Sequence, residues 1–184
     1  MSVLVTGVGF IGGYAVRDLL ALGEDVVLYG YFGGQGDPGG PLPELAYLDM
    51  LSGGGIRERT TIVVADVADL SALSKAAERY EVRKIMHFAT MLPTAAEAEP
   101  YAGTLVNVMG TANVFEVATR LSMEKVVCSS SQCVFGPRSV PRSGIVSDDS
   151  VFDPVWGYGA AKLMGEKLAR AYAQSKGPAP IAGL

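Results

Sequence analysis

A glycine-rich turn within the first dozen residues constrains the fold of this chain more than any other feature. Apolar residues 3–5 precede the turn, and residues 11–22 follow it with apolar side chains at helical spacing. Gly23 comes directly after this predicted helix, where glycine commonly ends helices. A short buried strand that passes through a tight turn into a helix is typical of βαβ units, whose strands run parallel.

The same alternation continues along the 184 residues. The predicted strands cover residues 3–5, 25–29, 61–65, 84–89 and 125–129, and a sixth could start at 181–184. The predicted helices cover residues 11–22, 44–51, 70–80, 101–121 and 153–175, and residues 30–43 predict a long loop. Because the strands are continuous apolar runs, we expect helices on both faces of a doubly wound parallel sheet, in three α/β/α layers.

Composition narrows the class of protein. The chain has 15 Lys and Arg against 19 Asp and Glu, which disfavours binding to nucleic acid through a basic face. Cys128 and Cys133 cannot build a disulfide framework, and no Cys/His cluster predicts a metal site. No apolar run reaches the roughly 18 residues of a membrane-spanning helix. We therefore expect one cytoplasmic domain, residues 1–184, without a nucleic-acid, membrane or metal partner.

The glycine-rich turn carries a candidate binding function. Residues 6–12 read Thr-Gly-Val-Gly-Phe-Ile-Gly, which contains GxGxxG between the predicted strand and helix. In that context Gly7 makes the turn, Gly9 lets the backbone approach a pyrophosphate, and Gly12 permits close packing of helix on strand. The free amides of the helix N-terminus would then face the phosphates. The alternative is a glycine-rich turn without a ligand.

The acidic residue that usually accompanies this pattern is missing. A carboxylate that binds the adenosine ribose is expected at the end of the second strand. Residues 26–31 read Val-Val-Leu-Tyr-Gly-Tyr, which puts Tyr29 in the expected position, and no Arg stands close by to hold a 2′-phosphate. The choice between NAD and NADP therefore stays open at this point.

A second pattern stands in the last predicted helix. Tyr158 and Lys162 are four residues apart, so their side chains share one helix face, and they follow a serine run at 129–131. A nearby ammonium favours a phenolate, and a serine hydroxyl can position the same substrate oxygen. Such a set moves a proton while a hydride passes between an alcohol carbon and a nicotinamide. The alternative is a surface tyrosine beside a solvated lysine.

Taken in order, these segments resemble the extended short-chain dehydrogenase/reductases, the NAD-dependent epimerase/dehydratase group. The resemblance runs from Val3 to about Ser175. Its pieces are VTGVGFIG at 5–12, ADVAD at 65–69, HFA at 87–89, NVMGTANVFE at 107–116, SSSQCVFG at 129–136 and YGAAK at 158–162. The glycine turn is one residue shorter than the family's TGxxGxxG, and Phe135 replaces the usual tyrosine.

The resemblance implies a Rossmann-like fold and roles for the matched residues. Tyr158 would be the catalytic acid or base, Lys162 would hold the nicotinamide ribose, and Ser131 would supply the catalytic hydroxyl. Asp66 and Val67 would border the adenine, and the buried His of the fourth strand would be structural. The expected cofactor-binding residues are Gly7, Gly9, Phe10, Ile11, Gly12, Asp66, Val67, Phe88, Ala89, Thr90, Asn107, Tyr158 and Lys162.

The resemblance also implies a function and a partner. We expect an NAD- or NADP-dependent epimerase, dehydratase or dehydrogenase that acts on a sugar-like or other secondary alcohol. Members usually continue far beyond the lysine helix into a substrate domain, which this chain is expected to lack. A non-catalytic dinucleotide sensor and a truncated piece of such an enzyme are the alternatives. A homodimer is expected because the family often pairs the helices that correspond to 101–121 and 153–175.

Overall fold

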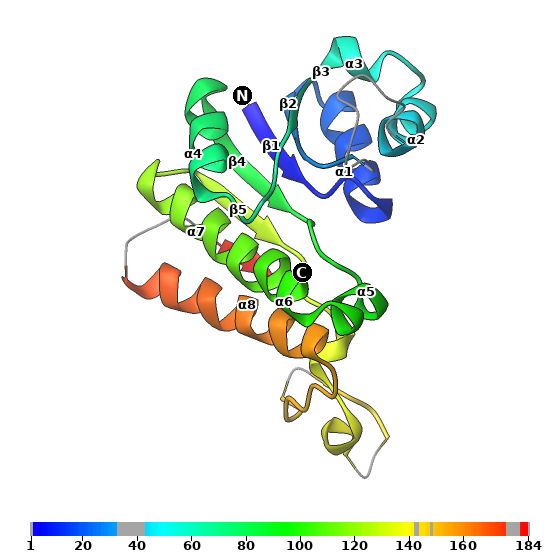
Figure 1. Cartoon of the computed structure of the whole chain (residues 1–184), viewed down its shortest axis with the longest axis vertical. Coiled ribbons are helices and arrows are strands. Elements are labelled where there is room, and N and C mark those ends of the chain that lie inside the picture. The colour runs from blue at the N-terminus through cyan, green and yellow to red at the C-terminus, as the bar shows by residue number, and fades with distance from the viewer. Residues whose placement is uncertain (1, 33–42, 142–143, 148, 176–180, 184) are drawn as a thin grey trace.

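The computed structural model describes residues 2–32, 43–141, 144–147, 149–175 and 181–183, and a parallel sheet forms its centre (Figure 1). Within these residues the six strands have the order β3–β2–β1–β4–β5–β6, and every neighbouring pair is parallel. The strands are β1 (Ser2–Thr6), β2 (Asp25–Gly30), β3 (Thr60–Val64), β4 (Val82–His87), β5 (Lys125–Cys128) and β6 (Ile181–Gly183). The predicted parallel sheet is confirmed.

The strand order reverses at β1. From β1 the chain moves outward to β2 and β3, and it then crosses back to build β4, β5 and β6 on the other side. In open α/β sheets, ligands bind beyond the carboxyl ends of the strands where the order reverses. In this chain those ends are Thr6 of β1 and His87 of β4.

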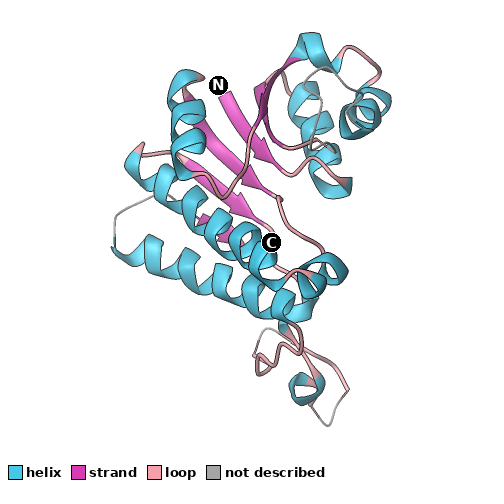
Figure 2. Ribbon diagram, viewed as in Figure 1, coloured by secondary structure: helices cyan, strands magenta, loops and turns pink. Residues whose placement is uncertain are grey.

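Helices cover the sheet on two faces (Figure 2). One face carries α1 (Phe10–Ala21), α2 (Pro43–Ser52) and α3 (Ile56–Arg59). The other face carries α4 (Leu70–Arg79), α7 (Thr111–Arg120) and α8 (Gly157–Ser175). None of the helices in the described part has the length and apolarity that crossing a membrane requires.

Alternation along β1 shows how the two faces are filled. Leu4 joins the core cluster that includes α4 and α7, whereas Val3 and Val5 join the cluster that includes α1 and α2. Successive side chains of a strand point to opposite faces, so a strand covered on both sides must be apolar throughout. The continuous apolar runs therefore predicted the three layers correctly.

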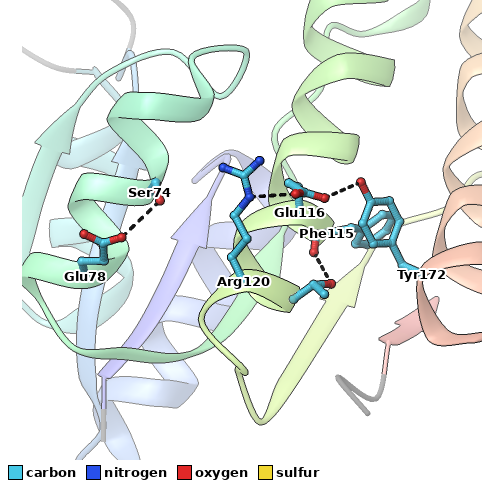
Figure 3. A network of polar contacts seen from close by, with 7 residues as sticks. Ser74, Glu78, Phe115, Glu116, Arg120 and Tyr172 are labelled. Carbon is cyan, nitrogen blue, oxygen red and sulfur yellow. Dashed lines mark hydrogen bonds and ion pairs between the residues drawn. The ribbon is translucent and has the colours of Figure 1, made fainter. Parts of the chain in front are cut away.

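A polar contact holds α8 against α7 (Figure 3). The Tyr172 hydroxyl donates to Glu116 Oε2 at 3.0 Å, and Arg120 Nε donates to Oε1 of the same carboxylate at 2.7 Å. The ring of the fully buried Phe115 lies 5.8 Å from the Tyr172 ring. The Tyr172 contacts join α7 to the C-terminal half of α8, whose first two turns carry Tyr158 and Lys162.

Two predicted helices differ from those in the structure. The single helix predicted at 101–121 consists of α6 (Pro100–Thr104), a π-helical turn (Leu105–Gly110) and α7. A short helix, α5 (Pro93–Ala98), precedes them, and α8 begins at Gly157 rather than 153. Hydrophobic periodicity does not register one extra residue in a π-helical turn. Most of the loop predicted at 30–43 lies outside the described residues.

Candidate active site

The glycine turn joins β1 to α1 where the strand order reverses. Gly7 has a φ of 74°, and a Cβ on it would lie 2.3 Å from the Ala89 amide nitrogen. Gly12 is buried, and a Cβ there would lie 2.0 Å from the Gly7 carbonyl oxygen. A Cβ on Gly9 would meet nothing within 4 Å. Gly7 and Gly12 are therefore needed for the packing of the turn, whereas Gly9 borders open space.

Replacing Gly12 with alanine should destabilise the chain strongly. The added methyl group would overlap the Gly7 carbonyl inside a packed turn, which costs about 3 kcal/mol. The midpoint temperature of thermal unfolding should then fall by roughly 6–12 °C for a domain of this size. Gly9→Ala is the matched control, because the same methyl group meets no atom there. Equal unfolding temperatures for the two variants would contradict this reading of the turn.

The first turn of α1 presents backbone donors and apolar side chains. The N-cap of α1 is Gly9, which has no side chain to accept the amide protons of the first turn. Phe10 is 74% exposed and Ile11 is 61% exposed, and the Phe10 ring packs edge-on against Tyr14. An anion placed at this terminus would meet unpaired amides and the positive end of the helix dipole.

The end of β2 corrects one expectation. Tyr29 was predicted in the position that faces the ribose, but its side chain is fully buried, and its hydroxyl donates to the Asp66 carbonyl at 3.0 Å. The ring points into the core because it lies on the same strand face as Val27. Gly30 ends β2, and Tyr31 is the first exposed side chain beyond it.

Asp66 and Val67 follow β3 in a loop that is held in place from α7. The Asn113 side-chain amide donates to the carbonyls of Val67 and Ala68 at 3.0 and 2.9 Å. Val67 is buried, and a Cβ on Gly110 would lie 2.6 Å from its Cγ1. This positioning role of Asn113 was not predicted, and the one signal for it in the sequence is its place in the segment NVMGTANVFE.

Asn107 holds the segment that leaves β4. Its Oδ1 accepts from the Met91 amide at 2.7 Å and from the Thr90 hydroxyl at 3.0 Å, and its Nδ2 donates to the Met91 carbonyl at 3.0 Å. The backbone amides of Phe88 and Ala89 donate to Thr6, at its carbonyl and its hydroxyl oxygen respectively. The predicted residues 88–90 therefore lie directly beside the glycine turn, and the Asn107 amide fixes their path.

His87 is buried with a partner at each ring nitrogen. Nδ1 lies 2.7 Å from the Thr6 hydroxyl, and Nε2 lies 3.0 Å from the Thr111 hydroxyl, which itself donates to the Asn107 carbonyl. Because the Thr111 hydroxyl donates its proton to that carbonyl, its oxygen accepts from Nε2–H of His87. Burial, with a smaller effect of Lys162, lowers the His87 pKa to about 3. These contacts agree with the structural role expected of His87.

Tyr158 and Lys162 meet the serine run at the carboxyl end of β5. Lys162 Nζ donates to the Ser129 carbonyl at 3.1 Å and to its hydroxyl at 3.2 Å, and it lies 5.8 Å from the Tyr158 ring centroid. Burial lowers the pKa of Lys162. A Cβ on Gly159 would lie 2.1 Å from the Cys133 carbonyl oxygen, so the turn after Ser131 packs on the first turn of α8.

Two carboxylates that the sequence did not single out support this arrangement. The Ser130 hydroxyl donates to Glu166, which stands one turn beyond Lys162 on α8. The Tyr158 backbone amide donates to Glu97 Oε1 at 3.1 Å, which connects α5 to the start of α8. Both contacts join residues more than thirty positions apart, so no local sequence pattern predicts them.

Of two cavities in the described part of the chain, one borders these residues and the other lies away from them. One of about 380 Å³ lies between the end of β5 and α8, with Ser129, Ser130, Lys162 and Glu166 among its lining residues. A larger hollow of about 820 Å³ lies at the amino ends of the strands, and none of the predicted site residues lines it. The chemistry-bearing residues therefore gather at the carboxyl edge of the sheet.

Comparisons with known proteins identify relatives of this chain. The model of the NAD dependent epimerase/dehydratase family matches residues 3–183. D-erythronate dehydrogenase of Cupriavidus necator is 29% identical over 177 residues, which cover 95% of this chain and 51% of that protein. UDP-glucose 4-epimerase 3 of Oryza sativa subsp. japonica is 31% identical over 175 residues, which cover 92% of this chain and 44% of that protein.

A solved structure shows the same fold. MoeE5 in complex with UDP-glucose and NAD superposes with a TM-score of 0.75 at 26% identity, and the match covers 100% of this chain and 53% of that one. The chain spans about half the length of the curated relatives that it matches. Because the family match runs through all five predicted strands and both sequence patterns, the chain belongs to the NAD dependent epimerase/dehydratase family.

Proposed function

We propose that this chain binds NAD at the carboxyl ends of β1, β4 and β5 and takes part in hydride transfer to or from a secondary alcohol. The observation that carries the proposal is the state of the Tyr158 hydroxyl. The residue is 8% exposed, yet within the described part of the chain its hydroxyl has no hydrogen-bond partner. A phenol whose ring lies 5.8 Å from the half-buried Lys162 ammonium, and whose oxygen has no partner among the described residues, suits an acid–base group that meets a substrate.

The residues at the glycine turn fit a dinucleotide. The open space at Gly9 and the uncapped amides of Phe10 and Ile11 would receive the pyrophosphate. Asp66 and Val67 would border the adenine, and the segment 88–90 would line the nicotinamide half. When bound, the nicotinamide supplies the hydride acceptor or donor.

Lys162 would act on both the cofactor and Tyr158. An ammonium has three N–H donors, and Ser129 takes two of them, which leaves one for a ribose hydroxyl. Lys162 Nζ also lies 5.8 Å from the Tyr158 ring centroid, so the same ammonium stands beside both the ribose site and the phenol. The Ser131 hydroxyl would donate to the substrate oxygen while Tyr158 takes up or returns its proton.

The names of the relatives support one substrate class. The rice relative is a UDP-glucose 4-epimerase, the C. necator relative is a D-erythronate dehydrogenase, and MoeE5 was solved with UDP-glucose. These names share polyhydroxylated substrates, so a sugar-like secondary alcohol is the proposed substrate. Epimerisation and net dehydrogenation use the same proton transfer and differ in whether the ketone is released. The homodimer remains a prediction.

Calorimetric titration of the folded chain with NAD⁺ tests the proposal. We expect saturable binding with one site per chain, because the turn, the switch point and Lys162 are all in place. UDP-glucose and D-erythronate would then be supplied in turn, and formation of NADH or of the epimer would be measured. Absence of NAD⁺ binding by a chain with a cooperative thermal transition would reject the proposed function.

A further inference from the structure

The adenosine end of the site has no carboxylate at the position where NAD-binding strands usually carry one. Gly30 ends β2, and a Cβ on it would meet nothing within 4 Å. Tyr29 is buried and committed to the Asp66 carbonyl. Tyr31, which is 48% exposed, is therefore the first side chain beyond β2 that can reach a ligand at this edge.

The proton of the Tyr31 hydroxyl is already committed. Tyr31 donates to Asp66 Oδ2 at 3.0 Å, and Asp66 Oδ1 accepts from the Ala68 amide at 2.8 Å. The carboxylate is thus held from two sides and cannot turn away without breaking both bonds. Burial, the bond to Asp66 and the charges of Asp66 and Asp69 all raise the pKa of Tyr31, so the phenol stays protonated.

Because the Tyr31 hydroxyl donates its proton to Asp66, its oxygen can only accept a hydrogen bond from a ligand. A phenol has one proton, and with that proton on Asp66 only lone pairs face outward. A ribose 2′-hydroxyl has a proton to donate to them. A phosphate monoester carries about 1.5 to 2 negative charges near neutral pH and has mainly acceptor oxygens, so a 2′-phosphate would place lone pairs against lone pairs.

The negative charge beside Tyr31 also disfavours a 2′-phosphate. The Asp66 carboxylate accepts from the Tyr31 hydroxyl at 3.0 Å, and among the described residues Asp66 forms no salt bridge. A 2′-phosphate would therefore also meet the negative charge of the Asp66 carboxylate.

We propose that Tyr31, oriented by Asp66, is the residue that selects NAD over NADP by accepting a hydrogen bond from the adenosine 2′-hydroxyl. The inference rests on the proposed function, since it needs the adenosine to lie at the ends of β2 and β3. Asp66 acts here through Tyr31, as a positioning residue with a fixed charge.

Calorimetric titration with NAD⁺ and NADP⁺ tests the inference on the wild type and three variants. The wild type should bind NAD⁺ at least tenfold more tightly. Tyr31→Phe should weaken NAD⁺ binding about fivefold, the effect of one neutral hydrogen bond, and leave NADP⁺ binding unchanged or tighter. Asp66→Asn removes the charge and frees the phenol proton to turn outward, so the preference for NAD⁺ should fall about tenfold.

Asp69→Asn is the matched control for the loss of one charge. Asparagine keeps the N-cap bond that Asp69 makes to the Ala72 amide, and the removed charge is exposed and screened. The preference should therefore change less than about twofold in this variant. A larger effect of Asp69→Asn than of Asp66→Asn would overturn the role of the oriented hydroxyl.

The remaining outcomes distinguish failure of this inference from failure of the proposed function. NAD⁺ binding with an unchanged preference in Tyr31→Phe and Asp66→Asn would overturn the inference and leave the proposed function standing. A wild type that prefers NADP⁺ would do the same. Failure of the folded wild type to bind either dinucleotide would overturn both. If Asp66→Asn does not fold, the surface variant Tyr31→Phe still decides the outcome.

Discussion

Replacing Gly9 with valine should abolish NAD⁺ binding while the chain keeps its fold. The side chain would project into open space at the N-terminus of α1, where a Cβ meets no atom of the chain within 4 Å. Any pyrophosphate bound to the first amides of α1 would need that space. The free energy of unfolding should change by about 1 kcal/mol or less, because only the N-cap preference is affected. Calorimetry should show at least a 100-fold loss of affinity.

A valine at the other end of the same helix controls for this variant. Ala21 is the exposed last residue of α1, far from the glycine turn, so Ala21→Val should leave NAD⁺ affinity unchanged. Gly9→Ala should give an intermediate loss, because its methyl group fills less of the space. Normal affinity in Gly9→Val would mean that the open space at Gly9 is not the phosphate site.

Local sequence patterns predicted the parallel sheet and the helices that cover it. The inner strands β1 and β2 are short apolar runs because they are covered on both faces, and Gly12 is needed where α1 packs closely on the Gly7 carbonyl of the same turn. Such causes lie within about 20 residues of one another, so they leave a readable pattern. The parallel sheet and the three layers followed from that alternation, whereas the strand order is known from the structure.

The polar contacts that complete the candidate site could not be read in the same way. Glu97 and Tyr158 are 61 residues apart, and Asn113 and Val67 are 46 apart. Their pairing is set by how α5, α7 and α8 pack on the sheet, which no local pattern records. The burial of Tyr29 could have been predicted, because Tyr29 lies inside a strand covered on both faces and alternation puts its side chain on the same face as Val27.

Replacing Tyr158 with phenylalanine should reduce turnover by about 100- to 10,000-fold, the range for loss of a positioned acid–base group. The measurement is the rate of NADH formation or epimerisation with the alcohol that the wild type converts. NAD⁺ affinity should stay within about twofold, because the ring and Lys162 remain. Stability should also be nearly unchanged, since the Tyr158 hydroxyl has no partner among the described residues.

The same substitution at Tyr101 separates the chemistry from a general effect of removing a phenol. Tyr101 is 79% exposed on α6, so Tyr101→Phe should retain full activity. A loss in kcat confined to Tyr158→Phe, with NAD⁺ affinity kept, would assign the proton transfer to the Tyr158 oxygen. Equal turnover in the wild type and Tyr158→Phe would remove Tyr158 from the reaction, because the uncommitted hydroxyl is the only atom that this substitution deletes.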